Sequence, residues 1–297
     1  MPRNALFSAY LALAAVCFFW GTTYLGIRMA LETFPPLILI AVRFALAGTI
    51  LLTFARVRGL YIPRGRELAT NLLSGLLILG IGNGALVFAE QLIPSGLAGL
   101  IITISPFWMV TVEALLPGGA RLHAPTIGGM IVGMAGASLL FTKDLGAHAI
   151  DRPVLVGFLV LQAGMASWAF GSIYQRRRKG KAHSIIAAGV QQIGAAAGGA
   201  VVALLVPQPP LHWSARGVAA LLYLVCFGSI VGYSAYAYAL DRLPVAILSI
   251  YPYTNAVVAV TLGWLFYREP FGVREAGAMA VIFLGVALVK RYTRAVH

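Results

Sequence analysis

Long apolar stretches follow one another along this chain, and short breaks rich in proline, glycine or basic residues separate them. A helix needs about 20 residues to cross the ~30 Å hydrocarbon core of a bilayer. Ten stretches of about this length occur, at residues 9–30, 37–55, 68–90, 95–116, 124–142, 153–175, 184–206, 217–240, 245–267 and 273–290. The pattern predicts an all-α integral membrane protein with ten transmembrane helices. The first stretch begins like a secretory signal peptide, but it continues to Arg28, which is long for such a segment.

Residues recur at a nearly constant spacing across the two halves of the chain. Trp20 matches Trp168, and Arg43 matches Gln191, at an offset of 148. Further matches at offsets of 148 to 150 are Arg28 with Arg176, Gly128 with Gly277, Gly136 with Gly285, and Ile93-Pro94 with Leu243-Pro244. They predict two halves, 1–148 and 149–297, with five helices each. Because five is odd, the second half must enter the membrane from the opposite side, as in the inverted repeats of secondary transporters. A duplicated scaffold without transport is the alternative.

Composition agrees with a membrane protein and argues against nucleic-acid binding. Of the 297 residues, 60% are hydrophobic and 10% are charged, which is too little polar surface for a soluble chain of this length. The net charge of +13 would suggest nucleic acid in a soluble protein. Here the basic residues cluster in the breaks between apolar stretches, so the lipid bilayer is the expected partner.

The distribution of basic residues predicts the orientation. Cytoplasmic loops of membrane proteins carry an excess of Lys and Arg. With the N-terminus inside, the inner segments hold fifteen basic residues and the outer segments hold six. We therefore expect a multi-pass protein of the inner (plasma) membrane with both termini in the cytoplasm.

Motifs of common enzymes are missing from the sequence. The five histidines form no HExxH pattern, and neither a GxSxG elbow nor a Walker A loop occurs. The two cysteines, Cys17 and Cys226, both lie in apolar stretches and have no metal-binding spacing. We expect neither an enzyme nor a metal or other cofactor, although an intramembrane enzyme remains an alternative.

Polar uncharged and aromatic residues near the middle of the apolar stretches are the candidates for substrate binding. A carrier binds its substrate near the bilayer midplane, between the repeats. The candidates are Trp20, Thr22, Asn83, Ser105, Trp108, Gln162, Trp168, Tyr233, Ser249 and Tyr251. Core packing is the alternative for each tryptophan. Three tryptophans in different helices nevertheless favour a shared aromatic cavity.

Two prolines interrupt stretches that the repeat matches. Pro106 lies in the fourth stretch and Pro252 in the ninth. A proline inside a helix frees a carbonyl and bends the helix, and such breaks in both halves are typical of a transport path. We expect Pro106 and Pro252 to mark kinks or hinges.

Three charged residues fall inside apolar stretches, and each has an alternative to a binding role. Glu90 and Glu113 lie near stretch ends, so we expect their side chains to extend to an interface. Arg43 lies deeper and could attract a substrate carboxylate. A structural pair of Arg43 with Glu90 or Glu32, or hydrogen bonds to carbonyl groups at helix ends, is the favoured interpretation.

Several segments carry a family resemblance that covers nearly the whole chain. Phe19-Trp20-Gly21-Thr22 and Leu39 to Ala47 resemble the first two helices of the drug/metabolite transporter superfamily, EamA type. The run Ser249 to Val260, with Gly263-Trp264 and Arg268-Glu269-Pro270, resembles that family's ninth helix and following turn. Two departures occur: Ala256 replaces a frequent proline, and Pro117-Gly118-Gly119 stands in the first half where the second has Arg268-Glu269-Pro270.

The resemblance implies a secondary transporter with two five-helix repeats. The deep tryptophans are most similar to the YddG-type aromatic amino acid exporter. We therefore expect export of amino acids, including aromatic ones, by alternating access through a central cavity. A carrier for drugs or nucleotide sugars is the main alternative, although nucleotide sugars would require several buried cations. A channel or receptor is a further alternative. Neither a coupling ion nor an oligomeric state follows from the sequence.

Overall fold

The described part of the chain consists of helices joined by loops. The computed structural model describes residues 3–119, 124–139, 152–178, 180–243, 245–248 and 251–294, and these ranges contain helices and no β-strand. The predicted boundary at residues 148–149 lies outside them. The helices of the first half are α1 (Arg3–Ala30), α2 (Pro36–Val57), α3 (Gly65–Gly75), η1 (Leu76–Asn83), α4 (Gly84–Ala89), α5 (Ser95–Ile102), α6 (Ser105–Leu115) and α7 (Ala124–Ser138).

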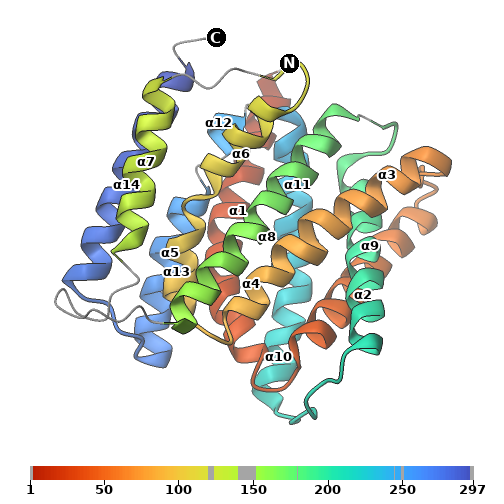
Figure 1. Ribbon diagram of the computed structural model, residues 1–297. Helices are drawn as coiled ribbons and strands as arrows, with labels where there is room; N and C mark the ends of the chain where they lie inside the picture. The colour runs from red at the N-terminus through yellow and green to blue at the C-terminus, as the bar shows by residue number, and fades with distance from the viewer. Residues whose placement is uncertain are drawn as a thin grey trace.

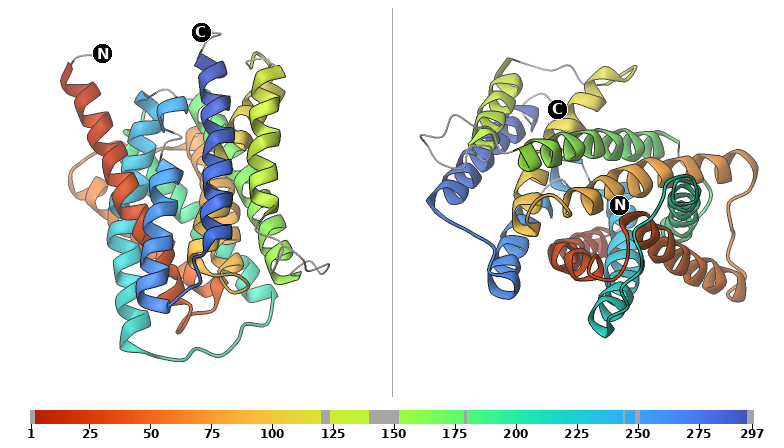
Figure 2. Two further views of the ribbon diagram at one scale, coloured as in Figure 1. Left: turned by 90° about the vertical axis from the view of Figure 1, so that its left-hand side faces the viewer. Right: turned by 60° about the horizontal axis from the view of Figure 1, so that its bottom comes forward.

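The second half has the same order of long and interrupted helices. Its helices are α8 (Arg152–Arg177), α9 (Ser184–Leu205), α10 (Ala215–Tyr223), η2 (Leu224–Tyr233), α11 (Ser234–Arg242), α12 (Val245–Leu248), α13 (Tyr251–Tyr267) and α14 (Val273–Arg294). Figures 1 and 2 show the helices running side by side in a single bundle, with the start of α1 and the end of α14 at the same end of it. We call this the termini end.

Seven helical segments in the described part of the chain are long and apolar enough to cross a membrane. They are Leu6–Ala30, Pro36–Val57, Gly65–Ala89, Ser95–Leu115, Arg152–Arg177, Ser184–Leu205 and Ala215–Arg242. The described parts of α7 and α13 have 15 and 17 residues, and both begin directly after residues outside the described ranges. The structure therefore supports a multi-pass membrane protein, and ten crossings remain a prediction.

Contacts between helices join matching parts of the two halves. Helix α7 packs on α14, and α2 packs on α9. Helix α1 packs on α10, η2 and α11, just as α8 packs on α3, η1 and α4. This reciprocal pattern is what a duplicated five-helix unit predicts.

Two π-helical segments lie at corresponding places in the halves. The segment η1 links α3 to α4, and η2 links α10 to α11, so each sits in the middle of one long helix. A π-helix widens the backbone ladder and shifts the side chains that follow it, and it is found frequently at functional sites. Both segments contribute residues to the cavity described below.

Glycines allow close approach of helices from different halves. A Cβ atom on Gly75 of α3 would lie 1.8 Å from the carbonyl oxygen of Gln191 in α9. A Cβ atom on Gly285 of α14 would lie 2.4 Å from the backbone nitrogen of Gly133 in α7. Close backbone packing of this kind is the main source of helix association in membranes, so these contacts fasten one half to the other.

Both predicted proline sites lie in the first turn of a helix. Helix α5 ends at Ile102 and α6 begins at Ser105, with Pro106 in its first turn. Pro252 is the second residue of α13, whose predecessor α12 ends at Leu248. A proline is well tolerated in the first turn of a helix because its missing N–H has no partner there. The candidate Ser249 lies outside the described residues.

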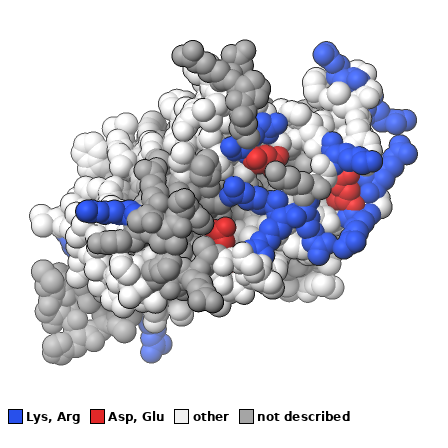
Figure 3. Space-filling view, turned by 90° about the horizontal axis from the view of Figure 1, so that it is seen from above, with Lys and Arg blue, Asp and Glu red and all other residues white. Residues whose placement is uncertain are grey.

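Basic side chains gather at the termini end. Figure 3 views this end and shows Lys and Arg side chains across much of it. The α2–α3 and α8–α9 loops and the helix ends beside them supply exposed residues there, namely Arg56, Arg58, Arg64, Arg66, Arg177, Arg178 and Lys181.

Candidate substrate-binding chamber

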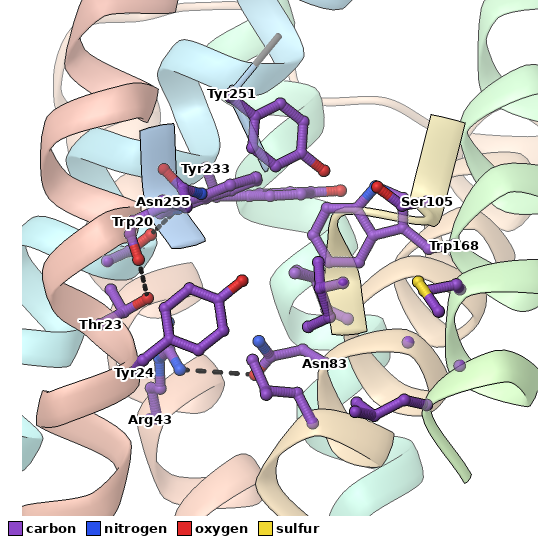
Figure 4. A pocket seen from close by; sticks show the side chains of 18 of the residues that line it. Trp20, Thr23, Tyr24, Arg43, Asn83, Ser105, Trp168, Tyr233, Tyr251 and Asn255 are labelled. Atoms are coloured by element: carbon purple, nitrogen blue, oxygen red, sulfur yellow. Dashed lines mark hydrogen bonds between the residues drawn. The ribbon is translucent and has the colours of Figure 1, made fainter. Parts of the chain in front are cut away.

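A narrow chamber lies inside the bundle, where both halves supply its wall. In the described part of the chain its lining comes from α1, α2, η1, α4, α5, α6, α8, η2 and α13. Figure 4 shows rings and polar groups from these elements pointing into it. The space open to the centre of a water molecule is about 70 Å³. One water needs roughly 10–15 Å³ on this measure, so the chamber holds a few waters and a larger ligand requires the rings to move.

Four aromatic rings pack around Trp20 at one side of the chamber. Its ring centroid lies 5.5 Å from that of Trp168, 5.1 Å from that of Tyr236 and 5.3 Å from that of Tyr251. The Tyr233 ring stacks on it at 6.5 Å. Trp20 Nε1 donates to the carbonyl oxygen of Gly228 at 2.9 Å, and Trp168 Nε1 donates to the Tyr236 hydroxyl at 3.0 Å. Both indole N–H groups are satisfied, so the tryptophans offer their ring faces to a ligand.

A buried arginine lies next to these rings. Arg43 is only 4% exposed and lines the chamber. Its Nε donates to Ser229 Oγ at 2.8 Å, and its Nη1 donates to Asn83 Oδ1 at 3.4 Å (Figure 4). Among the described residues, no carboxylate lies within 4.0 Å of its guanidinium. The expected pair with Glu90 or Glu32 is therefore wrong, because α2 turns this side chain toward η2 and η1.

An amide oxygen in the chamber wall has no protein partner. Asn255 of α13 is 1% exposed, lines the chamber, and its Oδ1 accepts no hydrogen bond from any described residue. A buried polar atom without a partner is costly, so this oxygen is available to a donor on a ligand.

The structure brings six of the ten predicted site residues together. Trp20, Asn83, Ser105, Trp168, Tyr233 and Tyr251 all line the chamber. The other described candidates do not line it. Thr22 pairs its hydroxyl with that of Tyr223, and Trp108 Nε1 donates to Gln162 Oε1 at 2.9 Å. Ser249 is not among the described residues.

The ten candidates leave out several lining residues that helical spacing points to. Thr23 and Tyr24 follow Trp20 by three and four residues, so they share its face of α1. Asn255 follows Tyr251 by four residues on α13. The apolar residues that complete the wall, among them Leu79, Leu86 and Met165, carry no such indication in the sequence.

A chain of hydrogen bonds leads from the chamber toward the termini end. The Tyr233 hydroxyl donates to Gln191 Oε1 at 2.6 Å, and Gln191 Nε2 donates to Asn71 Oδ1 at 3.0 Å. Asn71 lines a second, polar pocket together with Glu67, Arg178, His183, Asp241 and Arg242. The amide of Gln191 thus links α3, α9 and η2 across the two halves.

Comparisons with known proteins agree with this architecture. The chain is 35% identical over 298 residues to the uncharacterized inner membrane transporter YedA of Escherichia coli (strain K12), covering 97% of this chain and 92% of that protein. It is 27% identical over 293 residues to the probable terminal-alkyne amino-acid exporter of Streptantibioticus cattleyicolor, covering 97% and 95%. A protein of known crystal structure shares the fold at a TM-score of 0.71 and 22% identity, covering 98% of this chain and 99% of that one.

A family model supplies the assignment. The model of the EamA-like transporter family matches the chain twice, at residues 7–142 and 155–291. These matches cover most of both halves, and the bundle carries many apolar helices long enough to span a bilayer. The chain belongs to the EamA-like transporter family and is a multi-pass membrane transporter.

Proposed function

We propose that this chain is a secondary transporter that exports amino acids, including aromatic ones, by alternating access through the central chamber. One observation carries the proposal. The chamber combines a cluster of aromatic rings with one arginine and one amide oxygen that no described residue bonds to. No acidic side chain is among the described residues that line it.

Each part of an aromatic amino acid has a chemical match in this wall. The guanidinium of Arg43 suits the carboxylate, because charge-assisted hydrogen bonds to carboxylates are strong. Asn255 Oδ1 suits the ammonium, which can also rest on a tyrosine or tryptophan face. The substrate ring can stack on Trp20 and Trp168, at about 0.5–1.5 kcal/mol per pair beyond area burial.

The relatives are consistent with this substrate class. The name of the Streptantibioticus cattleyicolor protein describes it as a probable amino-acid exporter, whereas that of YedA specifies no substrate. A nucleotide-sugar carrier is less well supported, because Arg43 is the only Lys or Arg among the lining residues that the structure describes.

Alternating access in this proposal rests on the two halves, 1–148 and 149–297. The reciprocal helix contacts and the matching segments η1 and η2 support an inverted repeat. We expect the halves to superpose after a half-turn about an axis in the membrane plane, with Pro106 and Pro252 marking the hinges. An axis along the membrane normal would contradict this arrangement.

The proposed location is the inner membrane, with both termini in the cytoplasm. The gathering of Lys and Arg at the termini end supports this orientation, since cytoplasmic loops are enriched in them (Figure 3). A C-terminal reporter enzyme that is active only in the periplasm should be inactive, and one active only in the cytoplasm should be active. The reverse result would overturn the orientation.

Counterflow in proteoliposomes tests the substrate class. Vesicles containing the purified protein and a high concentration of one unlabelled amino acid should accumulate labelled tryptophan, phenylalanine or tyrosine transiently and with saturation. Protein-free vesicles are the control. Counterflow of none of the amino acids by well-folded protein would refute the proposal, and flux without saturation would indicate a channel.

A further inference from the structure

Glu90 is a buried carboxylate next to the chamber, and it has no hydrogen-bond partner among the described residues. It follows α4 directly, at the end of the bundle opposite the termini, and is 1% exposed. Neither of its carboxylate oxygens has a hydrogen-bond partner among the described residues. The sequence predicts that this side chain extends to the interface. That prediction is wrong, because α1 and the turn after α13 close over the position.

The neighbouring arginine does not neutralise this carboxylate by direct contact. Arg28 Nη1 donates instead to the main-chain carbonyl oxygens of Glu90, at 2.9 Å, and of Ile93, at 3.5 Å. In the part of the chain that the structure describes, no basic nitrogen lies within 4.0 Å of the Glu90 carboxylate. Arg28 therefore anchors the backbone at the end of α4 and leaves the carboxylate unpaired.

Charged and titratable groups act on Glu90 from three sides. Tyr24 and Arg28 belong to α1, Arg43 belongs to α2, and Glu269 lies in the turn after α13. Glu269 differs from Glu90 because its carboxylate is fully engaged. It accepts from Ser95 N at 3.0 Å, from Ser95 Oγ at 2.8 Å and from Gly96 N at 2.8 Å. Of these two neighbouring acids, Glu269 caps the start of α5, and Glu90 has no hydrogen-bond partner among the described residues.

Glu90 is also linked to the chamber by position. Leu86, one helical turn before it on α4, lines the chamber, and so do Tyr24 and Arg43. A change of charge at Arg43 is therefore felt at Glu90 across the protein interior, where screening is weak.

We propose that Glu90 is a proton-binding site whose occupancy is coupled to substrate binding at Arg43. Burial of an ionised carboxylate without hydrogen bonds is costly, and a proton removes that cost. The charges of Arg28 and Arg43 favour the ionised form while the chamber is empty. A substrate carboxylate on Arg43 offsets the charge of Arg43, so Glu90 takes up one proton from water as the substrate binds. The proton on Glu90 and the substrate then cross the membrane together, and Glu90 releases the proton when the substrate leaves.

This inference rests on the proposed function, and vesicle efflux separates the two. Proteoliposomes contain a luminal pH dye, an aromatic amino acid and the purified protein. Efflux of substrate should raise the luminal pH, with one proton leaving per substrate. Absence of any substrate efflux would refute the proposed function. Substrate efflux without a change in luminal pH would refute the role of Glu90 alone.

Substitution of Glu90 locates the proton site. Glu90→Gln should preserve substrate efflux and abolish the luminal pH change, whereas Glu90→Asp should retain both. Glu113→Gln is the matched control, since Glu113 lies on α6 and is partly exposed, and it should keep the pH change. A full pH change with Glu90→Gln would overturn the assignment. If Glu90→Gln fails to fold, folded Glu90→Asp decides the question: it should keep the stoichiometry of one proton per substrate, and the pH dependence of efflux should shift. Unaltered stoichiometry and pH dependence overturn it.

Discussion

Arg43 on α2 and Gln191 on α9 are matched by the sequence repeat, yet the two residues differ in their contacts and in their position relative to the chamber. Both are buried, and both contact the long interrupted helices of the two halves. Arg43 bonds to Ser229 in η2 and Asn83 in η1, and Gln191 bonds to Tyr233 in η2 and Asn71 in α3. Only Arg43 lines the chamber. Gln191 is 0% exposed, and both ends of its amide have protein partners.

The difference shows how a duplicated framework can carry a one-sided binding site. An amide whose donor and acceptor are both satisfied fastens helices together and has little left to offer a ligand. A guanidinium has five N–H donors, and two hydrogen bonds leave others available. The charge of Arg43 thus gives the chamber a cationic side, and the matched Gln191 holds helices of the two halves together.

Replacement of Arg43 should have the largest effect on transport. Arg43→Gln removes a charge-assisted hydrogen bond to the substrate carboxylate, worth about 1.5–3 kcal/mol. We expect an increase in the counterflow KM of about 10- to 100-fold. Arg43→Lys, which keeps the charge and loses the planar fork, should fall in between. A lower melting temperature with an unchanged KM in the folded fraction would show that Arg43 is structural.

Replacement of Gln191 should affect stability instead. Gln191→Leu leaves the Tyr233 hydroxyl and the Asn71 amide oxygen without their partner. An unsatisfied buried polar group costs about 1–3 kcal/mol, so the melting temperature of purified protein should fall. The KM should stay close to that of the unaltered protein. A rise in KM as large as that of Arg43→Gln would show that the two positions are equivalent after all.

Two tryptophans sharpen the contrast between lining the chamber and packing beside it. Trp168→Phe shrinks a ring at the chamber, so affinity for aromatic amino acids should fall by about 2- to 10-fold, as expected for 0.5–1.5 kcal/mol. Trp108→Phe is the matched control, because Trp108 bonds to Gln162 away from the chamber. Counterflow with a panel of amino acids gives both values. Equal losses in affinity would place Trp108 in the binding site.

Thr22 should give the smallest effect. Its hydroxyl forms a hydrogen bond with that of Tyr223, and Thr22 is not among the described residues that line the chamber. Thr22→Val removes that hydroxyl at a cost of about 0.5–1.5 kcal/mol in stability. Counterflow should be unchanged, and thermal melting should show a small decrease. A clear loss of transport with normal melting would extend the binding site along α1 beyond Trp20.

Several features of this transporter follow from its sequence alone. The apolar stretches define a membrane protein because no soluble fold could cover them. Pro106 lies in the first turn of α6 and Pro252 in the first turn of α13, where a proline is tolerated, whereas it would disrupt a helix interior. The spacing of Trp20, Thr23 and Tyr24 defines one face of α1, and the structure turns that face to the chamber.

Other features depend on tertiary structure. Trp108 of α6 and Gln162 of α8 meet in a hydrogen bond, because α6 packs on α8. Glu90 is buried, because α1 and the turn bearing Glu269 cover the end of α4. Helical spacing defines which residues share a face, but in lipid the outer faces are as apolar as the core. Hydrophobicity therefore cannot tell which face points inward, and only the packing of the helices decides which polar side chains meet.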